Sequence, residues 1–294
     1  LKHRHYTCPS TKDERAKHAP SGLTYKAKLN DDSNLMMERA LAPSIAHIVK
    51  PPSANATFNW ILYPKNGRFR GRVYSDGSRL DGPSALLARN GWAFVVVDDW
   101  DNVIALANGL PPDWIDDIPG TEAWAMLQAA IFAEPGWCQY FVDCEPCVNA
   151  VHRGPEYAFK DNRPLARVHR MLHEALGPIL ASDVVWIPSH TGPGQCGTAI
   201  RGDGFLLTEA DVAHNDVADN YAKWAVEAHR VPQRIRELIE SHDQLTHDNA
   251  VWIARATILA NQQPLEPHRD TQASRAAALV AAAAKKKAKR DGTD

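Results

Sequence analysis

Four acidic residues that lie far apart in the sequence could together bind metal ions. Asp76 lies in the segment YSDGS, Glu122 in TEAWA, Asp143 in YFVDC and Asp219 in NDVADNYA. Four clustered carboxylates repel one another unless cations share the site. Their hard oxygen atoms favour Mg²⁺ or Mn²⁺ over Zn²⁺. Two such ions would suit hydrolysis of a phosphodiester, because one activates water and the other stabilises the leaving oxygen.

Each acid also has an ordinary structural explanation. Asp-Gly-Ser is a common turn, so Asp76 could simply end a strand. Glu122 could stabilise the N-terminus of a helix, and Asp143 could cap the helix that follows it. Asp219 could be a solvated helix residue. The four residues indicate a site only together, through the elements that position them.

Alternating strand and helix patterns over residues 67–230 place these acids on successive elements. Strands are expected at 69–74, 92–97, 103–107, 139–142 and 184–187, and helices at 120–134, 146–152, 165–176 and 212–229. Thr121 can cap the first of these helices. Three successive strands with short connections predict an antiparallel meander, which the later helix-linked strands extend into a mixed sheet. If the first and fourth strands are neighbours, Asp76 and Asp143 lie side by side.

The order and local context of the four acids resemble those of ribonuclease H, especially the domain attached to reverse transcriptases of non-LTR-like retroelements. YSDGS resembles the first motif of that family, TEAWA the second, VDC the third, and Asn215 with Asp219 the fourth. The second motif usually reads A-E-L-x-A, so Ala123 stands where the family has leucine. The resemblance covers residues 67–230.

The resemblance implies a ribonuclease H-like α/β fold with a five-stranded mixed sheet, in which the first three strands are antiparallel and helices cover both faces. It also implies that the four acids hold two Mg²⁺ ions, or Mn²⁺, and that His190 assists proton transfer or product release. Asp216 competes with Asp219 for the fourth position, and the Asn-to-Asp spacing of the family favours Asp219. The expected substrate contacts are Ser78, Arg79 and Asn215.

By the same resemblance, the chain would cut the RNA strand of RNA–DNA hybrids as part of a retroelement reverse transcriptase polyprotein. Hybrid recognition would depend on phosphates and 2′-hydroxyls rather than on base edges. Four cations could bind phosphate or could simply form a solvated face; they are Lys160, Arg163, Arg167 and Arg170. The alternative is a catalytically inactive domain that only binds nucleic acid or acts as a scaffold.

Other activities fit the residues less well. Exonucleases of this fold carry a second acid two residues after the first, where this chain has Ser78. Integrases and transposases place their glutamate on a late helix, whereas Glu122 lies on an early one. Cys144 and Cys147 form a CEPC segment that starts a helix, as in thioredoxin-like redox proteins. That alternative leaves the acids unexplained.

The flanking segments predict a larger protein. His3 and Cys8 resemble the end of a zinc-binding segment within residues 1–20, with the other two Zn²⁺ ligands further upstream. Residues 21–66 are expected to be a linker, 231–270 a helical extension and 271–294 a basic disordered tail. The chain begins with leucine rather than methionine, which suggests a fragment.

Charge, apolar runs and cysteine content limit the partners and the compartment that the sequence allows. The net charge of −2 gives no global basic field, so contacts with nucleic acid need local patches. No apolar run approaches the roughly 20 residues that cross a membrane, so no membrane partner is expected. Five cysteines without a regular framework indicate free thiols in a reducing compartment. We therefore expect an intracellular protein, and the lysine-rich tail favours the nucleus.

Overall fold

The computed structural model describes residues 9, 12–19, 43–177, 183–189, 193–262 and 272–290. The predicted zinc ligands His3 and Cys8 and the predicted catalytic His190 lie outside these residues. The chain divides into two compact units, one of residues 46–236 and one of residues 1–45 together with 237–294. All four predicted acids belong to the first unit. No helix among the described residues is long and apolar enough to cross a membrane.

The described residues of the second unit are mainly helical. They include α1 (Lys12–His18), most of α9 (Gln233–Gln262) and α10 (Gln272–Arg290). The sequence predicts a disordered tail over residues 271–294, but residues 272–290 form α10, because alanine and lysine have high helix propensity. The helical extension expected after residue 230 corresponds to α9.

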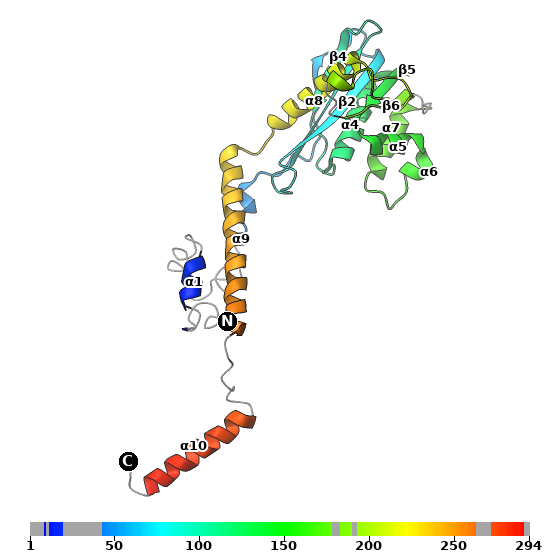
Figure 1. Cartoon of the computed structure of the whole chain (residues 1–294). Coiled ribbons are helices and arrows are strands. Elements are labelled where there is room, and N and C mark those ends of the chain that lie inside the picture. Colours follow the sequence, from blue (N-terminus) through cyan, green and yellow to red (C-terminus); the bar gives the residue numbers. More distant parts are fainter. Residues whose placement is uncertain are drawn as a thin grey trace. The chain divides into compact units, whose positions relative to one another are not determined.

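Six strands form one sheet in the order β1-β4-β3-β2-β5-β6 (Figure 1). They are β1 (Asn59–Leu62), β2 (Phe69–Leu80), β3 (Arg89–Val97), β4 (Val103–Gly109), β5 (Ala133–Val142) and β6 (Val184–Trp186). The neighbours from β1 to β2 are antiparallel, whereas β5 pairs in parallel with both β2 and β6. The predicted mixed sheet with an antiparallel first part is confirmed.

β1 is the strand that the sequence did not predict, so the sheet has six strands rather than five. It has only four residues and lies at the edge of the sheet, where its burial does not alternate. The segment before it is held by two hydrogen bonds with Leu110. The backbone nitrogen of Thr57 donates to Leu110 O at 3.0 Å, and Leu110 N donates to Thr57 Oγ1 at 2.9 Å.

Helices cover both faces of the sheet, as predicted, because alternating side chains of each strand point to opposite faces. On one face, Val73 and Phe94 pack in a core with α4 (Ile118–Phe132), α5 (Glu145–His152) and α7 (Ala166–Leu176). On the other face, Tyr74 and Val95 pack with α8 (Glu209–Glu227). The shorter helices are η3 (Ala46–Ile48), α6 (Pro155–Ala158) and η5 (Pro193–Gln195).

The prediction that Asp76 ends its strand is wrong. β2 continues through the Asp-Gly-Ser segment to Leu80, and Asp76 pairs with Ala93 of β3. The glycine after Asp76 therefore has a role other than making a turn.

The predicted cap of α4 is also wrong, by one turn of helix. α4 begins at Ile118, because Asp117 accepts a hydrogen bond from Gly120 N at 2.7 Å and so caps the helix. Thr121 donates its hydroxyl to Asp117 O at 2.8 Å instead. Glu122 consequently lies in the second turn of α4, not the first.

Candidate metal centre

Asp76, Glu122 and Asp143 come together in the structure. One carboxylate oxygen of each residue lies within 4.8 Å of an oxygen of the other two. Asp76 lies on β2, Glu122 on α4, and Asp143 directly follows β5. Because the parallel register sets Ser75 opposite Val142, the residues that follow each of them are neighbours.

Gly77 allows α4 to approach β2. A Cβ atom at this position would lie 2.7 Å from the backbone nitrogen of Glu122 and 2.9 Å from the carbonyl carbon of Thr121. Any side chain here would push the helix and the strand apart. The glycine of YSDGS therefore serves this close approach, which brings Glu122 to Asp76.

Two of the three acids are buried, and Asp143 is partly exposed. Asp76 is 6% exposed and Glu122 is 3% exposed. Burial, followed by the charges of Asp143 and Asp219, raises the pKa of Asp76 to about 7. Burial and the charge of Asp76 raise the pKa of Glu122 well above its ordinary value. Three ionised carboxylates are therefore unfavourable here unless a cation compensates their charge.

Two oxygen atoms of the cluster are available to a cation. Asp76 Oδ2 and Glu122 Oε2 are buried and accept no hydrogen bond. A buried carboxylate oxygen without a donor costs free energy, and a bound metal ion removes that cost. The donor set consists of carboxylate oxygens, which suit Mg²⁺ or Mn²⁺. The residues present therefore fit a hard divalent cation.

The fourth predicted acid, Asp219, lies near the cluster but outside it. It lies on α8, and its charge contributes to the raised pKa of Asp76. Its Oδ2 accepts a hydrogen bond from Lys223 Nζ at 2.6 Å, across one turn of the helix. The competing acid Asp216 is exposed on the same helix. The geometry thus favours Asp219 over Asp216 as the fourth acid of the site, although the Asp219 carboxylate forms an ion pair with Lys223.

The predicted substrate contacts have different surroundings. Asn215 faces the cluster and donates its amide to Asp143 Oδ2 at 3.5 Å. Ser78 is only 8% exposed, and Arg79 next to it is half-buried. The roles of all three, and that of His190, stay predictions.

A buried polar network beside the cluster was not predicted. The carboxylate of Asp211, at the start of α8, accepts hydrogen bonds from Tyr74 Oη at 2.8 Å, Arg201 at 3.0 Å and Thr208 Oγ1 at 2.7 Å. Burial would raise the pKa of Asp211, but the hydrogen bonds and the charge of Arg201 lower it below its ordinary value. The T-x-x-D spacing is a capping-box signal that could have revealed part of this network.

The CEPC segment packs directly against the acids. Cys147 is fully buried and donates its thiol to Pro119 O at 3.1 Å, which ties α5 to the start of α4. A hydrogen bond with the Cys147 thiol lowers the pKa of Cys144. The charge of Cys144 contributes to the raised pKa of Glu122, so the cysteines are part of the surroundings of the cluster.

Arginine side chains stack on aromatic rings around α6 and α7. The guanidinium of Arg163 lies 3.5 Å from the ring centroid of Tyr157, and that of Arg167 lies 4.2 Å from the ring of Trp114. Stacking holds each cation in place without neutralising it. We call this region the basic surface; it consists of the exposed Arg153, Lys160, Arg167 and Arg170 and the partly exposed Arg163.

Comparisons with known proteins find distant structural matches only. No family model and no curated protein matches the chain. The ribonuclease H domain of prototype foamy virus has 17% identity and a TM-score of 0.36, over 55% of this chain and 98% of that domain. The protease–reverse transcriptase of that virus has 17% identity and a TM-score of 0.35, over 57% of this chain and 22% of that one. A foamy viral protease–reverse transcriptase in complex with RNA/DNA hybrid has 13% identity and a TM-score of 0.34, over 74% of this chain and 28% of that one.

The topology of the chain itself defines its class. Three antiparallel strands followed by two parallel strands, in the order β4-β3-β2-β5-β6 with helices on both faces, form the ribonuclease H-like fold that the motifs predicted. β1 adds a sixth strand at one edge. The candidate metal centre lies on the elements that carry the predicted motifs.

Proposed function

We propose that the unit of residues 46–236 is an endonuclease that cleaves the RNA strand of RNA–DNA hybrids by metal-dependent hydrolysis. The observation that carries the proposal is the cluster of Asp76, Glu122 and Asp143, in which one oxygen each of Asp76 and Glu122 is buried without a hydrogen-bond partner. Three converging carboxylates destabilise a metal-free fold, because burial and repulsion within the cluster raise the pKa values of Asp76 and Glu122. Binding of divalent cations accounts for their presence.

In this proposal the three acids would hold two Mg²⁺ or Mn²⁺ ions, and Asp219 would be a further ligand in competition with Lys223. The bound ions would activate water and stabilise charge on the leaving oxygen. The chain holds the carboxylates in position: α4 is set against β2, and the amide of Asn215 orients Asp143. His190 would assist proton transfer or product release.

The basic surface is the proposed contact with the phosphates of the hybrid. Its arginines are pre-oriented by stacking, so less side-chain entropy is lost when they bind phosphate. Such contacts would position the duplex, and contacts with 2′-hydroxyls would distinguish RNA from DNA. We further propose, on the motif resemblance alone, that a reverse transcriptase in the same or a longer chain is the partner.

One observation favours the second candidate, an inactive domain that binds nucleic acid or acts as a scaffold. The carboxylate of Asp219 is paired with Lys223, so a cation would have to compete for it. This pair is partly exposed, and such pairs are weak. We therefore favour the active enzyme.

A cleavage assay separates the two candidates. The full chain is incubated with a hybrid labelled on its RNA strand, in Mg²⁺ and in EDTA, beside a DNA duplex of the same sequence. The proposal predicts cleavage of the RNA strand in Mg²⁺ alone, which Asp76→Asn abolishes. Binding of the hybrid without cleavage in Mg²⁺ or Mn²⁺ would instead support the scaffold.

A further inference from the structure

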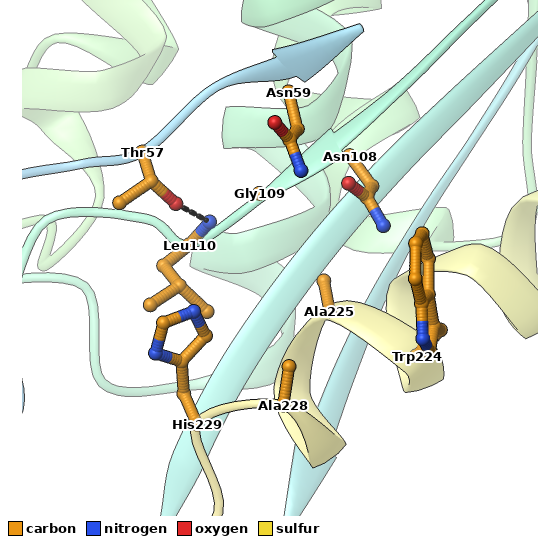
Figure 2. Close-up of a pocket in the computed structure, with 9 residues that line it drawn as sticks. All are labelled: Thr57, Asn59, Asn108, Gly109, Leu110, Trp224, Ala225, Ala228 and His229. Carbon is orange, nitrogen blue, oxygen red and sulfur yellow. Dashed lines mark hydrogen bonds between the residues drawn. The ribbon is translucent and has the colours of Figure 1, made fainter. Parts of the chain in front are cut away.

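A second candidate site lies between the sheet edge and the C-terminal end of α8. It is an open cavity of about 80 Å³. Figure 2 shows the amides of Asn59 and Asn108 on its sheet side, and the indole of Trp224 with the methyl groups of Ala225 and Ala228 on its helix side. The small residues of the helix leave the space open.

The two asparagines of the cavity lie in the same row of paired residues across the sheet as Asp76. The strand registers set Asp76 opposite Ala93, Ala93 opposite Asn108, and Asn108 opposite Asn59. Directly paired residues share one face of a sheet, so both asparagines lie on the same face as Asp76. With neighbouring strands roughly 4.8 Å apart, Asn59 lies about 14 Å from Asp76.

Two residues of the cavity wall, Asn108 and Trp224, contact Tyr221, which helps to hold them in place. Asn108 is 2% exposed and donates its amide to Tyr221 O at 3.1 Å. The ring of Tyr221 meets that of Trp224 edge to face, with centroids 5.9 Å apart. Trp224 nevertheless stays 55% exposed, so its indole is available to a ligand.

The chemistry of the walls favours a neutral, planar ligand. The lining residues include no aspartate, glutamate, lysine or arginine, and His229 is the one ionisable group among them, so a phosphate would find no permanent counter-charge. The amide side chains offer both donors and acceptors, as the edge of a nucleobase requires. An aromatic face beside such groups is the usual means of binding an unstacked base.

We propose that this cavity binds one unpaired nucleobase of a strand that extends from the hybrid, with the base stacked on Trp224 and its edge against Asn59. This inference rests on the proposed nuclease function, which supplies the nucleic acid. At the roughly 3.4 Å per nucleotide of a stacked duplex strand, 14 Å corresponds to at most about four nucleotides, and an extended strand needs fewer. The bound base would therefore lie within about four positions of the phosphate that is cleaved.

The test measures binding rather than cleavage. Hybrids with a single-stranded extension of about six nucleotides, 5′ or 3′, are made with normal or abasic extensions. Their affinity for the full chain is measured by fluorescence anisotropy in EDTA. We expect the wild type to prefer one normal extension over its abasic counterpart by about fivefold or more. Trp224→Ala should remove this preference, and Asn59→Ala should reduce it.

Trp100→Ala is the matched control, because Trp100 is 79% exposed and lies in the turn after β3. It should keep the wild-type preference. A wild type that cleaves blunt hybrid but shows no preference for a normal extension, or a Trp224→Ala variant that keeps the preference, would overturn this inference alone. A wild type that neither binds nor cleaves hybrid would overturn the proposed function as well.

Discussion

Gly77 and Glu122 are in direct backbone contact between β2 and α4, at a distance that a side chain on residue 77 would not permit. Asp76, one residue earlier, meets the Glu122 carboxylate only because of this contact. The contact therefore predicts a coupled loss of stability and metal binding when the glycine is replaced.

Gly77→Ala should lower the free energy of unfolding by about 1–3 kcal/mol, because its methyl group overpacks the contact between helix and strand. It should also weaken Mg²⁺ binding, because Glu122 moves away from Asp76. Urea unfolding and calorimetric titration with Mg²⁺ measure the two effects. Gly194→Ala is the control, since no atom lies within 4 Å of its added Cβ. Wild-type stability in Gly77→Ala would refute the close-approach role.

The metal-free protein should gain stability when Asp76 is replaced. Burial raises the folded-state pKa of Asp76 from its ordinary 3.8 to about 7. A raised pKa stabilises the folded state fully below the unfolded pKa, and that contribution is lost as the pH rises through the folded pKa. In EDTA at about pH 8, Asp76→Asn should therefore be more stable than the wild type by up to about 4 kcal/mol. Thermal melts should show that this advantage of Asp76→Asn disappears near pH 4. If Asp76→Asn and the wild type were equally stable at about pH 8 as well as near pH 4, the prediction would be contradicted.

Lys223→Gln should lower the Mg²⁺ concentration that the enzyme requires for cleavage. The Nζ atom of Lys223 lies 2.6 Å from Asp219 Oδ2 and would compete with a cation for that carboxylate. Partly exposed ion pairs contribute roughly 0.2–1 kcal/mol, so the Mg²⁺ concentration for half-maximal cleavage should fall by up to about fivefold. An unchanged or higher Mg²⁺ requirement would show that Asp219 does not bind the metal.

Arg163→Ala and Arg167→Ala should each weaken hybrid binding and reduce its dependence on salt. Each lost phosphate contact lowers the slope of log affinity against log salt by about 0.7–0.9. Anisotropy measured over a salt series gives the slope. Arg70→Ala removes the same charge from an ion pair with Glu134 and serves as the control. A slope in the two basic-surface variants equal to that of Arg70→Ala would exclude this surface as the phosphate contact.

The order of elements and the meeting of Asp76 with Asp143 could be predicted because both depend on local patterns. Period-two alternation marks the strands, and parallel neighbours end at the same edge of a sheet. Glu122 joins them through α4, and the helical spacing of apolar residues in the sequence also predicts this helix. The part of the site that could be predicted is therefore the part fixed by strand order and helix position.

What the sequence did not reveal depends on contacts between distant segments. YSDGS looks like a turn, and only the approach of α4 shows why its glycine continues a strand. Asp211 reads as a capping residue, yet its carboxylate also binds Tyr74 and Arg201. β1 is too short for its sequence pattern to indicate a strand, and it forms by pairing with the edge of β4.

The most direct test of the central claim is the rate at which the RNA strand of a hybrid is cleaved by the wild type and by Asp143→Asn in the same Mg²⁺ buffer. Loss of residues that merely orient metal ligands costs about 10–100-fold in metal affinity or activity, so loss of a ligand should cost more than about a hundredfold. Asp243→Asn, an exposed acid on α9, should keep the wild-type rate. We predict Mg²⁺-dependent cleavage that Asp143→Asn nearly abolishes; comparable cleavage by Asp143→Asn and the wild type would contradict the account.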